Sequence, residues 1–303
     1  MNIAITGGNG FIGSNLTNMI SNMGHNVILI SRKRDPANKN SYSFDDFFNY
    51  NIDQEMNCFI HLASPNYDYS RDSSLIEGIT NLTTKILETL FKYNCKKFIF
   101  FSSAKIYGEP SLARTVFSEE SKPMPVSDYG KEKLNAENKI ISHAKRYDLD
   151  YIIYRLPMVY GSNKNSNIDK LFKLINNSFP LILFKNSNHL KKSLISIENV
   201  KLFIKLNIED INTIDKDILN ISDNKAMSLN ELVNNYKTIT NSNSFIIYLP
   251  YSFLKFLVKV PVIKRIFLKL YGGFKIQNTK INNLHNVNIA DTIEQLSSDL
   301  SPN

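Results

Sequence analysis

The stretch that decides the fold is Asn2-Ile3-Ala4-Ile5-Thr6-Gly7-Gly8-Asn9-Gly10-Phe11-Ile12-Gly13, close to the start of the chain. Residues of strand type lead directly into a G-x-x-G-x-x-G turn, and an apolar helical pattern follows. Gly7 permits the tight bend, Gly10 lets the backbone approach a pyrophosphate at the helix N-terminus, and Gly13 lets the helix lie close to the strand. A purely structural turn is the alternative. The flanking strand and helix favour a dinucleotide site, and the residues expected to contribute to it are Gly7, Gly10, Phe11, Ile12 and Gly13.

The end of the second strand bears on which dinucleotide binds. Roughly 20 residues after the turn, an acidic residue would hold the ribose hydroxyls of NAD. This chain has Ser31-Arg32-Lys33-Arg34 there, and a hydroxyl with a guanidinium fits a 2′-phosphate that a carboxylate would repel. We therefore expect Ser31 and Arg32 to favour NADP(H) over NAD(H). The alternative is that these are solvated loop cations.

Short apolar runs alternate with helical patterns through the first half of the chain. This alternation is typical of successive βα units and predicts an α/β fold, a Rossmann doubly wound parallel sheet. The segment 32–56 is polar and weakly patterned, so a strand there should be short or irregular. The expected strands are Asn2–Thr6, Val27–Ser31, Cys58–Ala63, Lys97–Ser102, Asp150–Arg155 and, later, Ile218–Ser222; the expected helices are Phe11–Met23, Ser73–Tyr93 and Asp128–Tyr147.

The character of the sequence changes near residue 160, beyond which Asn-, Ser- and Lys-rich loops separate shorter helical patterns. With roughly 150 residues per domain as a prior, a chain of 303 residues suits two domains. We predict an NAD(P)-binding domain over residues 1–160 and a smaller C-terminal α/β substrate-binding domain over residues 161–303. One strand and some helical segments of the second part should return to the main sheet.

Composition excludes several classes of protein. The chain is 43% hydrophobic and 21% charged, which is ordinary for a packed globular protein and excludes wholesale disorder. No apolar run approaches the roughly 18 residues of a membrane span, and no signal-peptide pattern precedes the first strand. Cys58 and Cys95 each precede an apolar run, which favours buried, reduced thiols and a cytoplasmic protein. The histidines have no metal-ligand spacing, so no metal is expected.

Tyr129-Gly130-Lys131-Glu132-Lys133 contains a Y-x-x-x-K pair, whose spacing places both side chains on one helix face. A neighbouring ammonium favours phenolate, so it would lower the tyrosine pKa from about 10 and make Tyr129 a general acid/base. Five tyrosines of this chain have the same spacing to a lysine, so spacing alone decides nothing. Only Tyr129 begins a helix downstream of a strand ending in hydroxyl residues, where open α/β sheets bind ligands. Ser103 would there hydrogen-bond a substrate oxygen; a structural serine turn is the alternative.

Together the motifs resemble the extended short-chain dehydrogenases/reductases, the NAD(P)-dependent nucleotide-sugar epimerase/dehydratase family, in its 4-ketoreductase and 4-epimerase branch. Besides the glycine turn and Tyr129…Lys133, the matching segments are His61-Leu62-Ala63-Ser64, Ser102-Ser103-Ala104-Lys105-Ile106-Tyr107-Gly108 and Arg155-Leu156-Pro157-Met158-Val159-Tyr160-Gly161. The resemblance implies a catalytic triad of Ser103, Tyr129 and Lys133, with Lys133 also holding the nicotinamide ribose. Further cofactor residues that it implies are Leu62, Ala63, Ser64, Asn81 and Pro157. From the residues alone, His61 on an apolar strand is more consistent with a core histidine than with a catalytic one.

The resemblance also implies residues that contact the substrate, namely Lys105, Asn167 and Lys192. Lys192 stands where the family usually has an arginine that grips the substrate diphosphate; it keeps the charge but loses the bidentate fork. Asn167 precedes a helical pattern, so an ordinary helix N-cap is its alternative role.

The net charge of +8 suits anionic partners such as nucleotides, nucleic acids or lipid headgroups, or else reflects a lysine-coated surface. No basic arm is present, so we expect no nucleic-acid partner. The segment Tyr251–Tyr271 mixes Phe and Leu with five basic residues, a pattern that suits either an ordinary packed region or peripheral contact with a membrane.

The sequence thus predicts an NAD(P)-dependent oxidoreductase acting at C4 of a UDP-hexose, in the synthesis of surface-polysaccharide precursors. The main expectation is reduction of a UDP-4-keto-6-deoxy-(N-acetyl)hexose, because Ser31 and Arg32 favour the NADPH pool. A UDP-hexose or UDP-N-acetylhexosamine 4-epimerase uses the same triad and is the alternative; an NADP-sensing regulator is the non-enzyme alternative. Relatives pair through two long helices, which implies a homodimer here.

Overall fold

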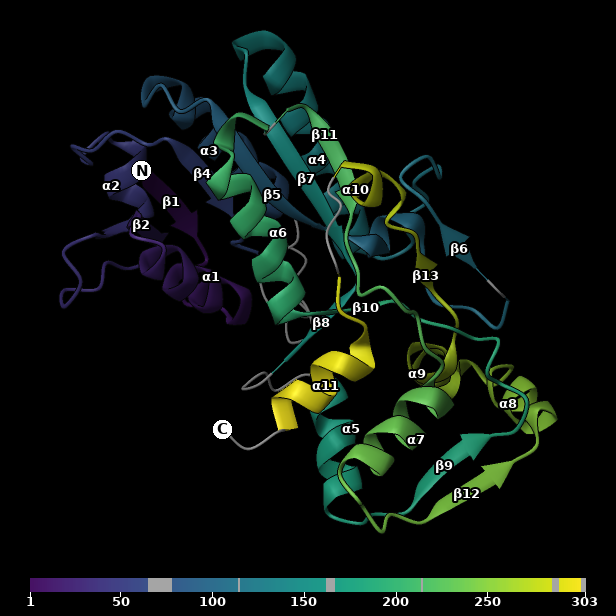
Figure 1. The fold of residues 1–303 in the computed structure, drawn as a ribbon. Coiled ribbons are helices and arrows are strands. Elements are labelled where there is room, and N and C mark those ends of the chain that lie inside the picture. Colours follow the sequence, from purple (N-terminus) through teal and green to yellow (C-terminus); the bar gives the residue numbers. More distant parts are fainter. Residues whose placement is uncertain (65–77, 114, 162–166, 214, 285–288, 301–303) are drawn as a thin grey trace. The chain divides into compact units, whose positions relative to one another are not determined.

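The computed structural model describes residues 1–64, 78–113, 115–161, 167–213, 215–284 and 289–300 (Figure 1). Its contacts divide the chain into two units that alternate along the sequence. Unit 1 consists of Met1–Gly108, Lys122–Leu156 and Val200–Leu219, and unit 2 of Glu109–Ser121, Pro157–Asn199 and Asn220–Asn303. The chain therefore crosses between the units several times. The sequence predicts a first domain over residues 1–160 and a second over 161–303, with one strand and some helical segments of the second returning to the main sheet.

Unit 1 is built on a seven-stranded sheet of order β11-β7-β5-β4-β1-β2-β3. Neighbouring strands from β3 to β7 run parallel, with Thr6 of β1 opposite His61 of β4 and Ser103 of β5 opposite Leu156 of β7. Chain order reverses between the central strands β1 and β4, so the carboxyl ends of these two strands form the topological switch point at which such folds bind ligands. The strands are β1 Asn2–Thr6, β2 Asn26–Ser31, β3 Ser41–Ser43, β4 Cys58–His61, β5 Lys97–Ser103, β7 Asp150–Leu156 and β11 Asp217–Asn220.

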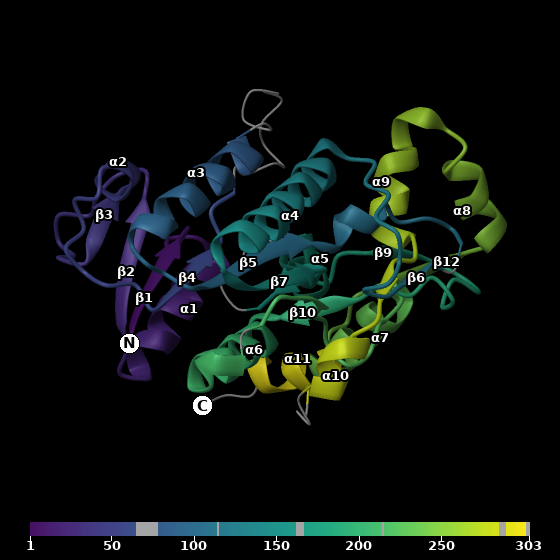
Figure 2. The same cartoon turned by 90° about the horizontal axis from the view of Figure 1, so that it is seen from above.

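Helices cover both faces of this sheet, with α3 and α4 on one face and α1 and α6 on the other (Figure 2). Beneath α3 and α4 lies the main core of the unit, where Phe59, Phe98 and Phe100 are fully buried. The helices are α1 Phe11–Asn22, α2 Phe44–Phe48, α3 Gly78–Lys92, α4 Asp128–Tyr147 and α6 Ile197–Glu209, with 3-10 turns η2 Ala104–Tyr107 and η3 Ile211–Thr213.

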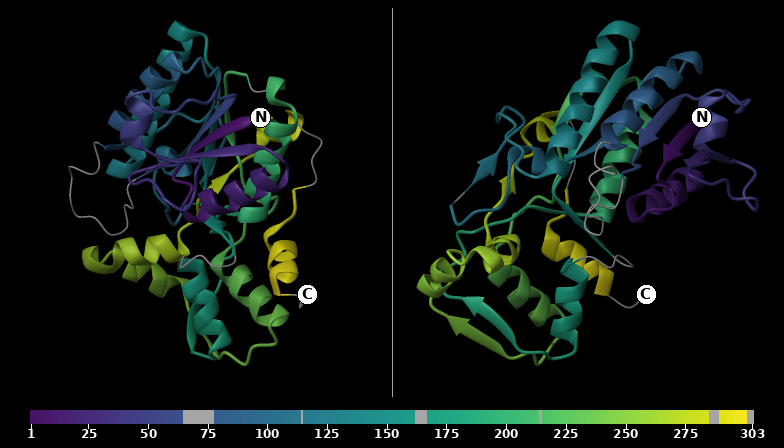
Figure 3. Two further views of the ribbon diagram at one scale, coloured as in Figure 1. Left: turned by 90° about the vertical axis from the view of Figure 1, so that its left-hand side faces the viewer. Right: turned by 180° about the vertical axis from the view of Figure 1, so that it is seen from behind.

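Unit 2 combines three two-stranded parallel pairs with six helices in its described part. The pairs are β6 Val116–Phe117 with β13 Lys275–Ile276, β8 Met158–Tyr160 with β10 Leu194–Ser196, and β9 Leu181–Phe184 with β12 Ile246–Leu249. The helices are α5 Asn167–Asn176, α7 Leu229–Ile239, α8 Tyr251–Leu257, α9 Pro261–Tyr271, α10 Thr279–Leu284 and α11 Thr292–Leu300. Within this unit α8 and α9 lie on the side opposite to α11 (Figure 3).

The buried carboxylate of Asp223 organises unit 2. It accepts hydrogen bonds from the Tyr160 hydroxyl (2.7 Å), the Ser196 amide (2.9 Å), the Asn199 side chain (2.8 Å) and the Thr292 hydroxyl (2.8 Å). Burial raises the pKa of Asp223 and these hydrogen bonds oppose the rise. One side chain thereby ties the ends of β8 and β10 to the last helix.

The doubly wound parallel sheet with a second α/β part is confirmed. The strand expected to be weak is β3, only three residues long, and the expected strand at 218–222 is β11. The expected start of the second helix at Ser73 lies outside the described residues. Both cysteines are buried as free thiols. Among the described residues no helix has the length and apolar character required to cross a membrane.

Candidate active site

The glycine turn joins β1 to α1 with almost no free space. Gly7 has φ +73°, and a Cβ there would lie 2.9 Å from the Ala63 backbone nitrogen. A Cβ on Gly13 would lie 2.1 Å from the Gly7 carbonyl oxygen. Gly10 is the N-cap of α1 and supplies no side-chain hydrogen bond to the first turn, and the N-terminus of a helix is a favourable position for a phosphate. Phe11 and Ile12 form the first turn of that helix.

The end of β4 lies directly beside this turn. The amides of Leu62 and Ala63 both lie 3.3 Å from the Thr6 hydroxyl oxygen, to which they donate. The buried Ser64 hydroxyl has no hydrogen-bond partner among the described residues. A cradle that a Cβ would fill and an unsatisfied hydroxyl at its border fit the polar backbone of a dinucleotide. Leu62 and Ala63 thus lie next to Gly7, and Ser64 follows them in the chain. Contact of these three residues with a cofactor stays a prediction.

Ser31, Arg32 and Asn81, further cofactor residues predicted in unit 1, have no described hydrogen bond to the glycine turn. Ser31 ends β2, and its hydroxyl donates to the Lys33 carbonyl oxygen at 2.6 Å, while Arg32 is exposed. Asn81 is exposed in the first turn of α3. No contact that the structure describes joins Asn81 to the glycine turn, so its role remains a prediction.

Tyr129 and Lys133 share the inner face of α4. The helix begins after Ser127, whose hydroxyl caps the Gly130 amide at 3.3 Å. A Cβ on Gly130 would lie 2.7 Å from the Lys105 carbonyl oxygen, so glycine lets α4 approach the turn that follows β5. The ammonium groups of Lys105 and Lys133 lie 5.8 Å and 5.9 Å from the centre of the Tyr129 ring. The half-buried phenol therefore has two lysine ammonium groups near its ring.

Ser103 is the last residue of β5 and caps the η2 turn, accepting a hydrogen bond from the Lys105 amide at 3.2 Å. Ser103 therefore has the structural turn role that is the alternative to substrate binding. Its oxygen accepts in this turn, so its hydroxyl proton can still be donated to another group. Ser103 and Tyr129 belong to the two segments that Gly130 brings together. The structure thus places Ser103, Tyr129 and Lys133 at one end of the sheet.

Lys133 is 2% exposed, and its ammonium donates to the Phe101 carbonyl oxygen at 2.7 Å. Burial lowers the pKa of Lys133 to about 7, while the nearby carboxylate of Glu137 acts in the opposite direction. The ammonium also lies 4.6 Å from the centre of the Phe100 ring. A buried lysine poised near neutrality is a group whose charge responds readily to an anionic ligand.

His61 is fully buried in the sheet beneath these residues. Its Nδ1 lies 2.7 Å from the Thr6 hydroxyl and its Nε2 3.1 Å from the Thr83 hydroxyl. Burial, together with the charge of Lys133, lowers the pKa of His61 to about 3, so the ring is neutral near pH 7. These contacts agree with the interpretation of His61 as a core residue.

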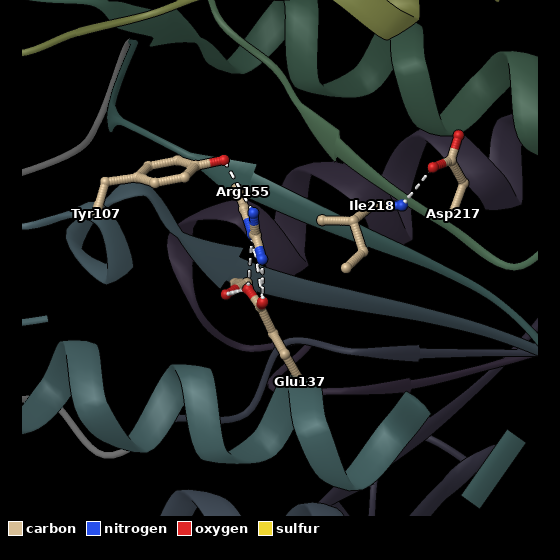
Figure 4. Close-up of polar contacts among 6 residues, drawn as sticks. Tyr107, Glu137, Arg155, Asp217 and Ile218 are labelled. Atoms are coloured by element: carbon tan, nitrogen blue, oxygen red, sulfur yellow. Dashed lines mark hydrogen bonds and ion pairs between the residues drawn. The ribbon is translucent and has the colours of Figure 1, made fainter. Parts of the chain in front are cut away.

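Sequence reasoning missed a buried ion pair between Glu137 of α4 and Arg155 of β7 (Figure 4). The Arg155 guanidinium donates to both carboxylate oxygens of Glu137, at 2.6 Å for the shortest contact, and to the Tyr107 hydroxyl at 2.9 Å. Ser102 donates a further, short hydrogen bond to Glu137. Glu137 follows Lys133 by four residues, so the spacing that identified Tyr129 and Lys133 would also have placed Glu137 on their face.

Three of the predicted site residues, Pro157, Asn167 and Lys192, belong to unit 2. Lys192 donates from its ammonium to the carbonyl oxygens of Lys269 (2.7 Å) and Leu270 (3.4 Å), at the C-terminal end of α9. Burial lowers the pKa of Lys192 to about 8, and the charge of Lys269 adds to the effect. Pro157 joins β7 to β8, and Asn167 is the first residue of α5. A phosphate contact by Lys192 remains a prediction, because two of its donors already face helix carbonyls.

Comparison with known proteins places the chain in context. A family model described as "NAD dependent epimerase/dehydratase family" matches residues 3–217. A UDP-glucose 4-epimerase of Vibrio cholerae is 28% identical over 246 residues, covering 76% of this chain and 73% of that protein. The crystal structure of a UDP-N-acetylglucosamine 4-epimerase from Bacillus cereus superposes with a TM-score of 0.77 at 17% identity, over 99% of this chain and 98% of the other. A UDP-glucuronic acid 4-epimerase from the same organism, in complex with NAD, gives 0.75 at 20% identity, over 99% and 95%.

Proposed function

This chain belongs to the NAD-dependent epimerase/dehydratase family, and we propose that it is a cytoplasmic 4-epimerase of a UDP-hexose that works with a bound nicotinamide dinucleotide. The observation that carries the proposal is the placement of Tyr129 and Lys133 on one face of α4, against the end of β5 that bears Ser103. The relatives described above are named as 4-epimerases, which favours a 4-epimerase over the 4-ketoreductase that is the main expectation from the sequence.

The roles of the three residues follow from their surroundings. Tyr129 takes the proton of the C4 hydroxyl and later returns it, because the two lysine cations near its ring stabilise a phenolate. Ser103 donates its free hydroxyl proton to the sugar oxygen and steadies the C4 ketone. Lys133 supplies positive charge and holds the ribose next to the reacting ring. The nicotinamide, when bound, supplies the chemistry of hydride acceptance and return at C4.

We propose NAD as the resident cofactor, because an epimerase keeps its cofactor through each cycle and the comparison structure above carries NAD. The preference for NADP that Ser31 and Arg32 predict has no support from that comparison. The Ser31 hydroxyl is already bonded to the Lys33 carbonyl oxygen, which lessens its value as a phosphate ligand. Mass spectrometry of the cofactor released from purified protein tests this point: NAD is the expected species, and NADP would restore the first expectation.

The decisive experiment follows deuterium at C4. UDP-glucose, UDP-N-acetylglucosamine and UDP-glucuronic acid, each with deuterium at C4, are incubated with the purified protein without added reductant and followed by NMR. An epimerase interconverts one of them with its C4 epimer and retains the deuterium, since the hydride returns to the carbon it left. A ketoreductase leaves all three unchanged and instead consumes NADPH in proportion to an added UDP-4-keto-6-deoxyhexose.

Two tyrosine variants separate chemistry from structure. Tyr129→Phe removes the phenolic proton and should lower turnover by about 10²-fold or more, while cofactor affinity is retained. Tyr93→Phe is the matched control, because Tyr93 also precedes a lysine by four residues but packs against the core of unit 1, where its hydroxyl donates to the Phe47 carbonyl oxygen at 3.3 Å. Turnover by Tyr129→Phe at the rate of the control would contradict the assignment. Cofactor binding without turnover of any sugar nucleotide by the unaltered protein would instead favour the NADP-sensing regulator.

The homodimer remains a proposal, which light scattering of the purified protein tests.

A further inference from the structure

The excess of basic over acidic residues in this protein arises in one segment. The whole chain has 36 basic and 28 acidic residues, for a net charge of +8. Residues 232–290 contain eight of the basic residues and none of the acidic ones, so the remainder of the chain is balanced at 28 against 28. This segment alone accounts for the net charge. Five of its cations lie on the hairpin formed by α8 and α9, namely Lys255, Lys259, Lys264, Arg265 and Lys269.

The hairpin is attached to unit 2 by one face only. Leu254 of α8 is fully buried and Tyr271 of α9 is 9% exposed; they are the only residues of the two helices in the buried class. Leu257 and Phe267 are partly buried against the same core cluster. These contacts fix the inner face of both helices, while most of their other residues are exposed.

Large apolar side chains are exposed on both helices. In α9, Val262, Ile266 and Leu270 are spaced by four residues, so they form one stripe, and they are 85%, 57% and 46% exposed. In α8, Phe253 and Phe256 are 44% and 60% exposed, and their rings stack with centres 6.3 Å apart. Single exposed apolar residues are ordinary, but five on two successive helices, three of them in one stripe, are typical of a binding surface.

Cations border this stripe. Arg265 and Lys269 each follow a residue of the α9 stripe by three positions, which places them along its edge. Lys259 follows Phe256 by the same spacing, in the loop between the helices. All three side chains are exposed. An apolar stripe with basic residues beside it is the pattern of a helix that lies in the interface of a lipid bilayer.

We propose that the α8–α9 hairpin docks on the surface of an anionic lipid bilayer, with its apolar stripe entering the headgroup region and its cations contacting lipid phosphates. The helices have 7 and 11 residues, so they are too short to span a bilayer of about 30 Å and lie along it. A second copy of the same face would oppose cations with cations, which disfavours self-association. Nucleic acid would meet the cations but leave the aliphatic stripe without a partner.

Vesicle co-sedimentation of the full-length protein tests this proposal. Vesicles contain either phosphatidylcholine alone or a mixture with about one third phosphatidylglycerol, at low salt and again at raised salt. We expect binding only to the anionic vesicles, weakened by salt because the attraction is screened. At low salt, Lys259→Gln/Arg265→Gln should bind about 25-fold more weakly, at about fivefold for each cation removed. Val262→Gln/Ile266→Gln should bind at least about tenfold more weakly.

The matched control is Lys39→Gln/Lys96→Gln, which removes two exposed cations from unit 1. It should bind as the unaltered protein does, and all three variants should unfold at the same temperature because every altered side chain is on the surface. The proposal is overturned by an absence of binding to anionic vesicles at low salt. Equal loss in the control is also against it, since net charge alone would then explain binding. Conversion of a dimer to a monomer by Val262→Gln/Ile266→Gln would also contradict the proposal, because it would show that a second copy of the chain covers the stripe.

Discussion

The buried pair of Glu137 and Arg155 gives the sharpest prediction about stability. Their side chains are 1% and 5% exposed, and Arg155 donates to both oxygens of the carboxylate. Glu137→Gln leaves the guanidinium buried with an uncharged partner. Removing one member of such a pair costs about 3–5 kcal/mol, mostly because the other charge is left uncompensated. We therefore expect the free energy of unfolding of unit 1, measured in urea, to fall by about 3 kcal/mol or more.

The control is an ion pair in the same sheet that remains partly in water. Lys97 and Asp150 pair at 2.6 Å and are 18% and 32% exposed, so Asp150→Asn should cost only about 0.2–1 kcal/mol. The double variant Glu137→Met/Arg155→Met should be more stable than Glu137→Gln, because it removes both buried charges. Equal losses for Glu137→Gln and Asp150→Asn, or a double variant less stable than the single one, would refute the reasoning.

Two further predictions concern the cofactor turn and the buried lysine. Gly13→Ala places a Cβ 2.1 Å from the Gly7 carbonyl oxygen and should weaken cofactor binding at least about tenfold in calorimetry; Gly24→Ala, at φ +81° but with nothing within 4 Å, should cost about 1 kcal/mol of stability and leave binding unchanged. Lys133 has a pKa of about 7 in the folded protein and about 10.4 unfolded, so the unfolded state binds more protons between these values and stability should rise with pH there, by up to about 1.4 kcal/mol per pH unit. Lys133→Met should lack this rise between pH 7 and 9, and parallel slopes for the two proteins would contradict the burial argument.

Local patterns in the sequence predicted most of unit 1. The strand-turn-helix of residues 2–13 and the four-residue spacing of Tyr129 and Lys133 depend on neighbours along the chain, and the structure has both. The short helix α2 was missed although its signal was local: Ser43 and Asp46 form a capping box at its start. The polar character of the segment hid that signal, because the helix buries only Phe47.

Contacts between distant parts of the chain could not be predicted from the sequence. Strand β6 pairs with β13, with Val116 opposite Lys275, and neither short strand has a periodicity of its own. This pairing is why residues 109–121 belong to unit 2, although the chain on both sides of them belongs to unit 1. Likewise, Arg155 was visible as part of a motif, but its partner Glu137 could be identified only when α4 was placed on β7. A buried charge in a sequence has a partner, and the fold decides which one.

The candidate active site follows from the geometry of one helix. Tyr129, Lys133 and Glu137 succeed one another at four-residue steps, so α4 presents a phenol, an ammonium and a carboxylate in a row along its inner face. Two of these groups bond to the strands that they face: Lys133 donates to the Phe101 carbonyl oxygen, and Glu137 accepts from Ser102 and Arg155. The carboxylate anchors the helix against β5 and β7, and this fixes the lysine that faces the phenol. Because the anchor is ionic and buried, a change at Glu137 reaches Tyr129 through the position of the helix as well as through the charge of Lys133.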